Sequence, residues 1–295
     1  MNYISTKLEQ ELFINSIISI HYFEYTTEFR YTGESHDFWE LIFCDKGELC
    51  ITAGNNTYVL SRGQAFLHPP AQFHNVCAHG GKSANSIIFS FESPTRELYG
   101  VSDRIIPTDG YVSSALFSVL REAKFSFQNE LGMLHDSQLI RKDDNAHFAS
   151  EQIIQNYIEL LLIHLIRSSQ NNEPFPELPQ NRIKNSLISD IVAYMSANLG
   201  AKITFTHLTH KFSISSTTLK NLFSKTYGHG AMEHLTLMRI EHAKELLRDG
   251  RYSCTDIAAT CGFCSVHHFS GVFRRHEGMS PTEYVKSVKS KLELT

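Results

Sequence analysis

Residues 265–278 read SVHHFSGVFRRHEG, and residues 215–228 read SSTTLKNLFSKTYG. The two stretches share one pattern at an offset of fifty residues: a first Ser, apolar side chains at positions five, eight and nine, a basic side chain at position eleven and a final Gly. An internal repeat of this kind indicates two copies of one structural unit. Two copies predict one task that is performed twice.

Each stretch predicts a short amphipathic helix. The first residue, Ser215 or Ser265, is a favoured N-cap because a seryl oxygen accepts a hydrogen bond from an unpaired N–H of the first turn. At about 100° per residue, the apolar positions share one face and the polar positions share the opposite face. The side chains predicted to point outward are Thr217, Lys220, Asn221 and Ser224 in the first helix and His267, Ser270, Gly271 and Arg274 in the second.

A second short helix and a tight turn precede each capped helix. These preceding helices are expected at 206–211 and at 255–261, with Gly262 in the second turn. This order is typical of a helix-turn-helix. The alternative is a pair of amphipathic helices in an ordinary helical core, and the duplication disfavours it.

Residues 231–248 predict one helix between the two units, ended by Asp249-Gly250. At 1.5 Å per residue this helix spans roughly 27 Å. With the flanking turns, we expect the two outward faces to lie about 34 Å apart, which is one turn of B-DNA. Arg239 falls within the apolar face, and we interpret it as structural because an unpaired buried charge is costly.

The second unit and its continuation carry a longer set of characteristic positions. They are Ile257-Ala258, Gly262-Phe263, Ser265, His268-Phe269-Ser270, Phe273-Arg274-Arg275, Gly278-Met279-Ser280-Pro281 and Tyr284. These positions resemble the signature of the AraC family of bacterial transcription regulators, and the wider region 183–288 resembles its seven-helix DNA-binding domain. Thr209 departs from that pattern where a small Ala is usual. Gly271 departs where a long polar side chain is frequent, so the resemblance implies that His267 and Ser270 carry base reading in the second unit.

Length and charge agree with two domains. The chain has 295 residues, of which 42% are hydrophobic, so it can build more than one core. The net charge of −4 alone would disfavour a nucleic-acid partner, but residues 1–182 have 13 basic and 22 acidic side chains whereas residues 183–295 have 14 and 9. The positive excess therefore lies in the predicted DNA-binding part. A chance asymmetry between two domains is the alternative.

The N-terminal part predicts antiparallel β structure. Apolar and polar residues alternate over 41–44, 48–53 and 57–60, and Gly54-Asn55-Asn56 provides a hairpin turn. Residues 111–128 and 148–167 then predict two helices. The second has more apolar surface than a solvent-facing helix, so it packs against the β structure or forms a two-fold contact with another subunit. Its many polar residues disfavour a membrane span.

Two half-motifs occur within the predicted β structure. They are His36, Glu40 and Gly47, followed by Gly63, Pro69 and His74. Over about residues 20–95 these half-motifs resemble a cupin barrel. Glu34 replaces the first histidine of the pattern, and Ala71 replaces a glycine.

In metal-dependent cupins the corresponding positions hold the metal ligands. The resemblance implies that Glu34, His36, Glu40 and His74 would form a mixed imidazole and carboxylate set suited to iron, manganese, nickel or zinc. That set would permit a metal-dependent cupin enzyme fused to a DNA-binding module, which is the alternative function. We expect no metal and no other cofactor, because the histidine pair is broken and because sensory domains of AraC relatives often lack a metal.

The same region is expected to form an effector pocket from His36, Trp39, Glu40 and His74. Trp39 is the only tryptophan and can stack on a sugar-like ligand. Strand alternation can equally turn it outward or into the core. By family analogy alone, the effector is a sugar or a related polar metabolite.

The cysteines favour a reducing compartment. Six cysteines without a basic-then-apolar leader predict a cytoplasmic protein. Cys261-Gly262-Phe263-Cys264 has redox or zinc spacing, but no second pair completes a zinc site. A small buried thiol also fits the turn of a helix-turn-helix, and we expect this packing role.

Residues 168–181, SSQNNEPFPELPQN, lack the apolar density to pack and predict a linker. We therefore expect an α+β protein of two domains: a cupin-like effector-binding and dimerisation domain at 1–167, with a β-barrel and two helices, a linker at 168–182, and an all-α AraC-type DNA-binding domain with two helix-turn-helix units at 183–295.

The predicted function is a ligand-responsive, sequence-specific transcription regulator and not an enzyme. It is expected to act as an activator and a homodimer on promoter sites in double-stranded DNA, with RNA polymerase as a further partner. The predicted DNA-binding residues are Thr217, Lys220, Asn221, Ser224, Lys225, His267, Ser270, Arg274 and Arg275. Lys225, Arg274 and Arg275 are assigned mainly to phosphates. A third hypothesis is constitutive DNA binding with a purely dimerising N-terminal domain.

Overall fold

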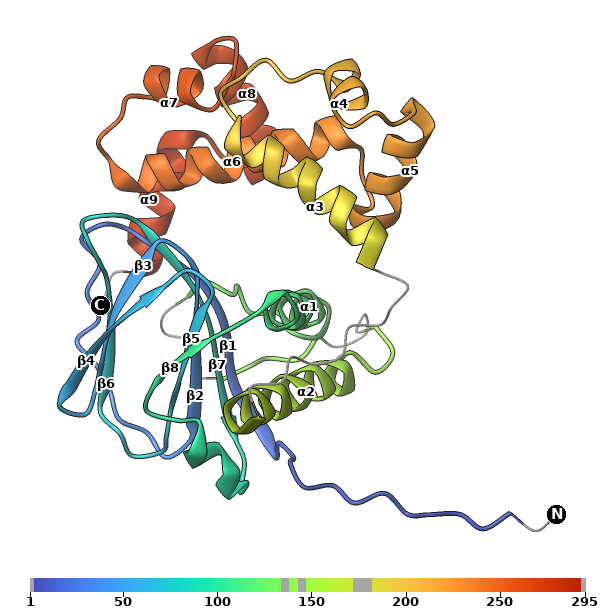
Figure 1. Ribbon diagram of the computed structural model, residues 1–295. Helices are drawn as coiled ribbons and strands as arrows, with labels where there is room; N and C mark the ends of the chain where they lie inside the picture. Colours follow the sequence, from blue (N-terminus) through green and yellow to red (C-terminus); the bar gives the residue numbers. More distant parts are fainter. Residues whose placement is uncertain (1–2, 134–137, 143–146, 172–181, 293–295) are drawn as a thin grey trace. The chain divides into compact units, whose positions relative to one another are not determined.

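The computed structural model describes residues 3–133, 138–142, 147–171 and 182–292 (Figure 1). These residues divide into two compact units, which are described separately. The N-terminal unit holds strands β1 to β8 and helices α1 and α2, and the C-terminal unit holds helices α3 to α8 and α9 up to Ser290. Most of the predicted linker, at 172–181, lies outside the described residues, and its first residues continue helix α2 as far as Asn171.

Two antiparallel sheets form the N-terminal unit. The larger sheet has the order β1 (Ser16–Tyr25), β7 (Ala84–Glu92), β2 (Trp39–Lys46), β5 (Gln64–His68) and β8 (Ile105–Pro107). The smaller sheet has the order β4 (Asn56–Ser61), β3 (Glu48–Ala53) and β6 (His74–Ala78). The predicted hairpin is confirmed, and Gly54 takes the turn with a φ of 58°, where a glycine is favoured.

The larger sheet has one face toward helices and one toward a cavity. Along β2, Trp39, Leu41 and Phe43 join a core with helices α1 (Gly110–Ser126) and α2 (Ser150–Asn171). The alternate residues Glu40 and Ile42 line the cavity between the two sheets. Because side chains alternate along a strand, β2 supplies both the core and the cavity.

Helix α2 buries its apolar stripe inside its own chain. Ile154, Ile158 and Leu161 are fully buried and pack in the core that the larger sheet shares with α1. The packing alternative therefore accounts for most of the apolar surface that the sequence placed on this helix. On the outer face, Leu160 remains 41% exposed. A two-fold contact of this helix stays a prediction.

The C-terminal unit is helical throughout its regular structure. Its elements are α3 (Arg182–Ala197), α4 (Phe205–Lys211), α5 (Ser216–Tyr227), α6 (Ala231–Asp249), α7 (Cys254–Thr260), α8 (Val266–Glu277) and α9 (Pro281–Leu292). Helix α6 connects the pair α4–α5 to the pair α7–α8 and ends at Gly250, whose φ is 68° (Figure 1). The two predicted helix-turn-helix units and the connecting helix are confirmed, and so is the α+β fold class.

The repeated positions have the same structural roles in both units. Ser215 Oγ accepts a hydrogen bond from Thr218 N at 3.0 Å, and Ser265 Oγ accepts one from His268 N at 3.1 Å. The final glycines cap α5 and α8 in left-handed conformation, with φ of 76° and 74°. Phe223 and Phe273, the ninth residues, are fully buried. The repeat thus fixes the caps and the buried face of both helices.

The turns of the two units differ in length. Helices α4 and α7 correspond at an offset of 49 residues, whereas α5 and α8 correspond at 50, so the second turn has one additional residue before its cap. Ser213 takes the left-handed position of the first turn with a φ of 52°, and Gly262 takes that of the second with 74°. A Cβ on Gly262 would lie 2.5 Å from the Leu199 carbonyl oxygen, so the second turn accepts only glycine without movement.

Arg239 holds these segments together, which confirms its predicted structural role. Its Nε donates to the Leu199 carbonyl at 2.9 Å, and its Nη2 donates to the Ala201 carbonyl at 2.7 Å. The guanidinium also lies against Gly262 in the second turn. The cation on the apolar side of α6 is therefore compensated by backbone carbonyls.

Candidate effector cavity and DNA-binding surface

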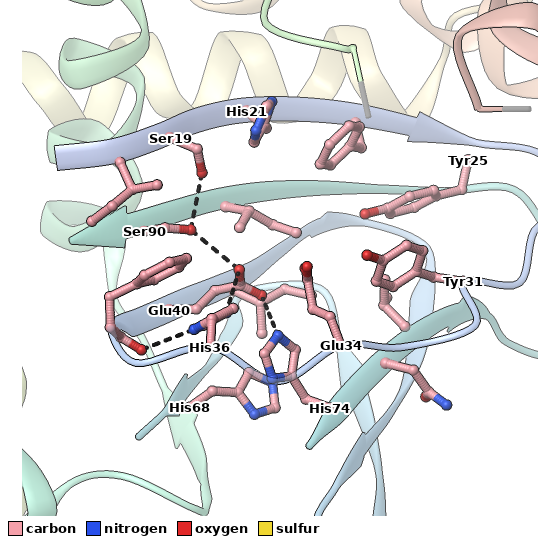
Figure 2. A pocket seen from close by; sticks show the side chains of 17 residues that line it. Ser19, His21, Tyr25, Tyr31, Glu34, His36, Glu40, His68, His74 and Ser90 are labelled. Carbon is pink, nitrogen blue, oxygen red and sulfur yellow. Dashed lines mark hydrogen bonds and ion pairs between the residues drawn. The ribbon is translucent and has the colours of Figure 1, made fainter. Parts of the chain in front are cut away.

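A cavity of about 480 Å³ lies between the two sheets of the N-terminal unit. Strands β1, β2, β5, β6 and β7 and the segment 31–38 line it (Figure 2). The lining combines apolar side chains such as Phe23 and Ile88 with acidic, imidazole, phenol and hydroxyl groups. An apolar cavity with a few convergent polar groups is the usual form of a small-molecule site.

Glu40 is the centre of the polar groups in this cavity (Figure 2). Its Oε1 lies 3.3 Å from His74 Nε2, and its Oε2 lies 3.7 Å from His36 Nε2. Ser90 donates to Oε2 at 3.2 Å, and Ser19 donates to Ser90 at 2.9 Å. The carboxylate is therefore held by residues from three strands and from the preceding segment.

Both imidazoles are oriented by the backbone. Nδ1 of His36 lies 3.1 Å from the Phe38 carbonyl oxygen, and Nδ1 of His74 lies 3.0 Å from the Gln72 carbonyl oxygen. A carbonyl only accepts, so each Nδ1 carries the proton and each Nε2 is directed at the cluster. Both Nε2 atoms are buried and make no well-oriented hydrogen bond.

The charges of the cluster are coupled. Burial alone would raise the pKa of Glu40, but the neighbouring imidazoles of His36 and His74 outweigh it and hold the pKa well below its usual range. Burial alone would lower the pKa of His74, whereas the Glu40 carboxylate raises it above the usual value. At His68, burial and the charge of His74 lower the pKa to about 4. Glu40 is therefore a carboxylate, His68 is a neutral imidazole, and His74 takes up a proton more readily than a free imidazole.

The segment that carries Glu34 and His36 is fixed to the smaller sheet. Glu34 N donates to the His74 carbonyl and His74 N donates to the Glu34 carbonyl, both at 2.9 Å. Gly33 has a φ of 99°, and a Cβ there would lie 2.4 Å from the Phe73 ring, so a glycine is needed at this close approach. This lining segment of the cavity is thus anchored through its backbone.

Three of the four predicted pocket residues lie together, and one does not. His36, Glu40 and His74 line the cavity with Glu34, and one ligand-type atom from each of these four residues lies within 4.8 Å of the others. Trp39 is excluded from the cavity: it points to the opposite face of β2, is 3% exposed, and donates from Nε1 to the Ser93 carbonyl at 3.2 Å. The stacking role predicted for Trp39 is wrong because strand alternation sends it into the core.

Sequence reasoning missed other polar residues of the cavity, notably Tyr25, Tyr31 and His68. His68 is opposite Glu40 in the β2–β5 register, and its ring stacks on His74 at a centroid distance of 4.4 Å. Its position directly before Pro69 of the second half-motif was the available signal. The two tyrosines come from β1 and from the segment before Gly33, where no motif marks them.

The mixed donor set fits a divalent transition metal. Two imidazole nitrogens and two carboxylates match the donors that iron, manganese, nickel and zinc accept. The two buried Nε2 atoms that make no well-oriented hydrogen bond are already aimed at the cluster. Each histidine also donates its other ring N–H to a carbonyl, which is the usual support of a metal-ligating histidine.

The outward faces of α5 and α8 form a second candidate site. In α5 the five predicted DNA-binding residues are exposed: Thr217, Lys220, Asn221, Ser224 and Lys225. In α8 His267, Arg274 and Arg275 are exposed, whereas Ser270 is half-buried. Both helices bury their opposite faces in the protein. Two short helices therefore present polar and cationic side chains to the exterior.

Gly271 leaves an open position on the exposed side of α8. A Cβ there would meet nothing within 4 Å, so packing does not require the glycine. At two corresponding positions the second unit has the shorter side chain: Ser270 corresponds to Lys220, and Gly271 corresponds to Asn221. The unequal base reading expected from the sequence stays a prediction.

The Cys261 and Cys264 thiols are placed differently. Cys261 is fully buried beneath the turn, and burial raises its pKa to about 12. Cys264 is exposed. Over residues 3–133, 138–142, 147–171 and 182–292, these two cysteines belong to no group with the geometry of a metal site. Cys261 takes the packing position that was expected of it.

In the described part of the chain, no helix has both the length and the apolar character needed to cross a membrane.

Comparison with known proteins places both parts of the chain in one family. A model of the AraC-like ligand binding domain matches residues 17–140, and a model of a helix-turn-helix domain matches residues 208–287. The HTH-type transcriptional regulator YfiF of Bacillus subtilis is 23% identical over 275 residues, which cover 89% of this chain and 81% of YfiF.

Two further similarities cover about a third of this chain each. The HTH-type transcriptional activator RhaR of Yersinia pseudotuberculosis is 37% identical over 94 residues, and the match spans about a third of each protein, 32% in both cases. A solved AraC-type transcriptional regulator from Chromobacterium violaceum is 25% identical, with a TM-score of 0.34 over 37% of this chain and 96% of that one. With its ligand-binding part and its two helix-turn-helix units, the chain belongs to the AraC family of transcriptional regulators.

Proposed function

We propose that this regulator activates transcription as a cytoplasmic homodimer that binds paired promoter sites and responds to a small molecule in the cavity. The observation that carries the proposal is the pair of exposed, capped helices α5 and α8 on one helical unit. The similarity to an activator supports the direction of control. Contact with RNA polymerase would follow from activation.

Helices α5 and α8 make different contacts with DNA in this proposal. Thr217, Lys220 and Asn221 reach base edges from the exposed face of α5, since amide, hydroxyl and ammonium groups make the usual direct contacts in a major groove. Lys225, Arg274 and Arg275 neutralise phosphates. His267 and Ser270 give the second unit a smaller share in base reading, with Ser224 as a further contact of the first.

The cavity is the sensory site of this proposal. Its phenol, imidazole, carboxylate and hydroxyl groups can hydrogen-bond a sugar or a related polar metabolite, while its apolar lining supplies burial. The effector acts only if it binds two arrangements of the regulator with different affinity. Dimerisation is assigned to the outer face of α2, where Leu160 remains exposed.

Paired substitutions in the full-length protein test the DNA assignment. Asn221→Ala should relax the preference at one base position, whereas Arg274→Ala should weaken binding to all sequences and reduce the salt slope by about one. Both are read from fluorescence anisotropy on promoter duplexes and on single-position variants at several salt concentrations. A uniform loss for Asn221→Ala together with a base-specific loss for Arg274→Ala would reverse the assignment.

A metal-dependent enzyme is the second candidate, and one observation favours it: the gathered ligand set in the cavity. We propose that the cavity senses and does not catalyse, because the family model that matches this part of the chain describes a ligand binding domain. The two candidates differ in a direct comparison. A sensor changes its affinity for promoter DNA when its ligand is added, whereas an enzyme consumes the ligand, which mass spectrometry of the small-molecule fraction detects.

A further inference from the structure

We infer that the sensory cavity binds one divalent first-row transition metal ion through Glu34, His36, Glu40 and His74, and that Glu34 is a true ligand at the position where the cupin pattern has a histidine. The inference rests on the proposed sensory role of the cavity. When bound, the ion would supply a strong positive charge and coordination positions for an oxygen-donor metabolite.

Four donor atoms converge in the cavity. One ligand atom from each residue lies within 4.8 Å of the others. Bonds of about 2.0–2.2 Å place two ligands of one ion at most about 4.4 Å apart, so binding of one ion needs the side chains to move inward by a few tenths of an ångström. The chain supplies them from three places: the segment before β2, strand β2 and strand β6. Donors from both sheets therefore converge on one place in the cavity, as a metal site requires.

The two imidazoles each direct one ring nitrogen at the cluster. His36 and His74 have buried Nε2 atoms without a well-oriented hydrogen bond, although buried polar atoms are normally paired. Their Nδ1–H groups are committed to backbone carbonyls, which leaves Nε2 as the only ligand atom and aims it at Glu40. Ser90 donates a hydrogen bond to Glu40 and so helps to orient the carboxylate toward the imidazoles.

Glu34 is anchored beside the other ligands. Its backbone exchanges two hydrogen bonds with His74, although its side chain is exposed. Two carboxylates balance the charge of a divalent ion, whereas a pattern with three histidines and one carboxylate leaves a net charge. Replacement of the histidine by Glu34 therefore changes the donor set without destroying it.

One consequence is mechanical. An ion held by these four residues links the segment 31–37 to β2 of the larger sheet and to β6 of the smaller sheet. Metal occupancy would thus add side-chain links between the two sheets to the backbone anchoring of this segment, and would change the affinity of the cavity for the effector. The ion is in this way an input to the sensor and not only a structural element.

The test uses the full-length protein, first stripped with a chelator and dialysed. Titration calorimetry with ZnCl2, MnCl2 and NiCl2 in separate experiments should show one equivalent for at least one metal, and elemental analysis after gel filtration should confirm it. Glu40→Gln and His74→Gln should reduce bound metal below about a tenth of an equivalent. Glu28→Gln and His79→Gln are matched controls on residues outside the cavity lining and should retain it.

Glu34 is tested by a pair of variants. Glu34→Gln should weaken metal binding at least about tenfold, and Glu34→His, which supplies another ligand, should restore it. A folding defect would weaken metal binding in both variants alike. Circular dichroism of each variant checks the fold. For the unmodified protein, visible absorption bands of bound Co2+ that disappear with excess Zn2+ provide a measurement without any variant.

The outcomes separate the metal site from the proposed function. Absence of binding above a tenth of an equivalent for all metals, or equal affinity in the native protein, Glu34→Gln and Glu34→His, overturns the inference. Anisotropy on promoter DNA is recorded with the same samples. If DNA binds normally and metal does not, only the metal site fails; if DNA does not bind at low salt, the proposed function fails whatever the metal result.

Discussion

The two helix-turn-helix units share one sequence repeat, yet they differ at positions that are not part of the repeated pattern. Both have a Ser cap, a buried Phe and a left-handed Gly at the end of the second helix. The second turn is one residue longer than the first. Its left-handed position holds Gly262, which lies against the Leu199 carbonyl oxygen, whereas Ser213 takes the left-handed position of the first turn. Packing is therefore maintained in both copies, while turn and exposed face are adjusted separately.

Removal of the buried aromatic ring has the largest expected effect in either unit. Phe223→Ala and Phe273→Ala each delete a fully buried ring, and about 3–5 kcal/mol of stability should be lost in each case. Urea unfolding followed by circular dichroism at 222 nm measures both. A much smaller loss in one variant would show that the repeat does not have equal structural weight in its two copies.

The turns should respond in opposite ways to exchange of their left-handed residues. Gly262→Ala is expected to destabilise by about 2 kcal/mol or more, because an L-residue is strained at positive φ and its Cβ meets the Leu199 oxygen. Ser213→Gly should be neutral or stabilise by up to about 1 kcal/mol, because it removes the same strain. Equal effects in the same urea assay would contradict the difference between the turns.

The caps are a matched pair with a smaller expected effect. Ser215→Ala and Ser265→Ala each remove the acceptor for one N–H of the first helical turn, and about 1 kcal/mol should be lost. Ser215→Asp and Ser265→Asp should keep most of the stability, since Asp is also a good N-cap. Thermal unfolding at fixed protein concentration compares all four, and loss in the Asp variants would argue against capping as the cause.

The smallest stability effect is expected at Gly271. Gly271→Ala lies on an exposed helix with open space around the new methyl group and should stabilise α8 by about 0.5–1 kcal/mol. Promoter anisotropy then sharpens the comparison of the two units. Unchanged DNA affinity would show that the second helix does not approach DNA closely at this point, whereas a clear loss would show that the glycine makes room for the duplex.

Much of this molecule was predictable because its signals are local. Helices α5 and α8, with their caps and buried faces, follow from a 14-residue pattern, and the β3–β4 hairpin follows from alternation around Gly54. The cavity was only partly predictable. His36, Glu40 and His74 belong to a linear motif, and His68 lies directly before Pro69 of that motif, whereas Tyr25 reaches the cavity through strand pairing that no nearby residue reveals.

The sequence by itself determined the family, the two capped helices and the residue types of the cavity, because hydrogen-bonded caps and apolar periodicity depend on neighbours a few positions apart. Tertiary structure decided the rest. It turned Trp39 into the core and Glu40 into the cavity, and it brought Glu34 to His74 across strands. The face of a strand that becomes buried depends on the register and on the helices that cover the sheet, and these are set by contacts between residues far apart in the chain.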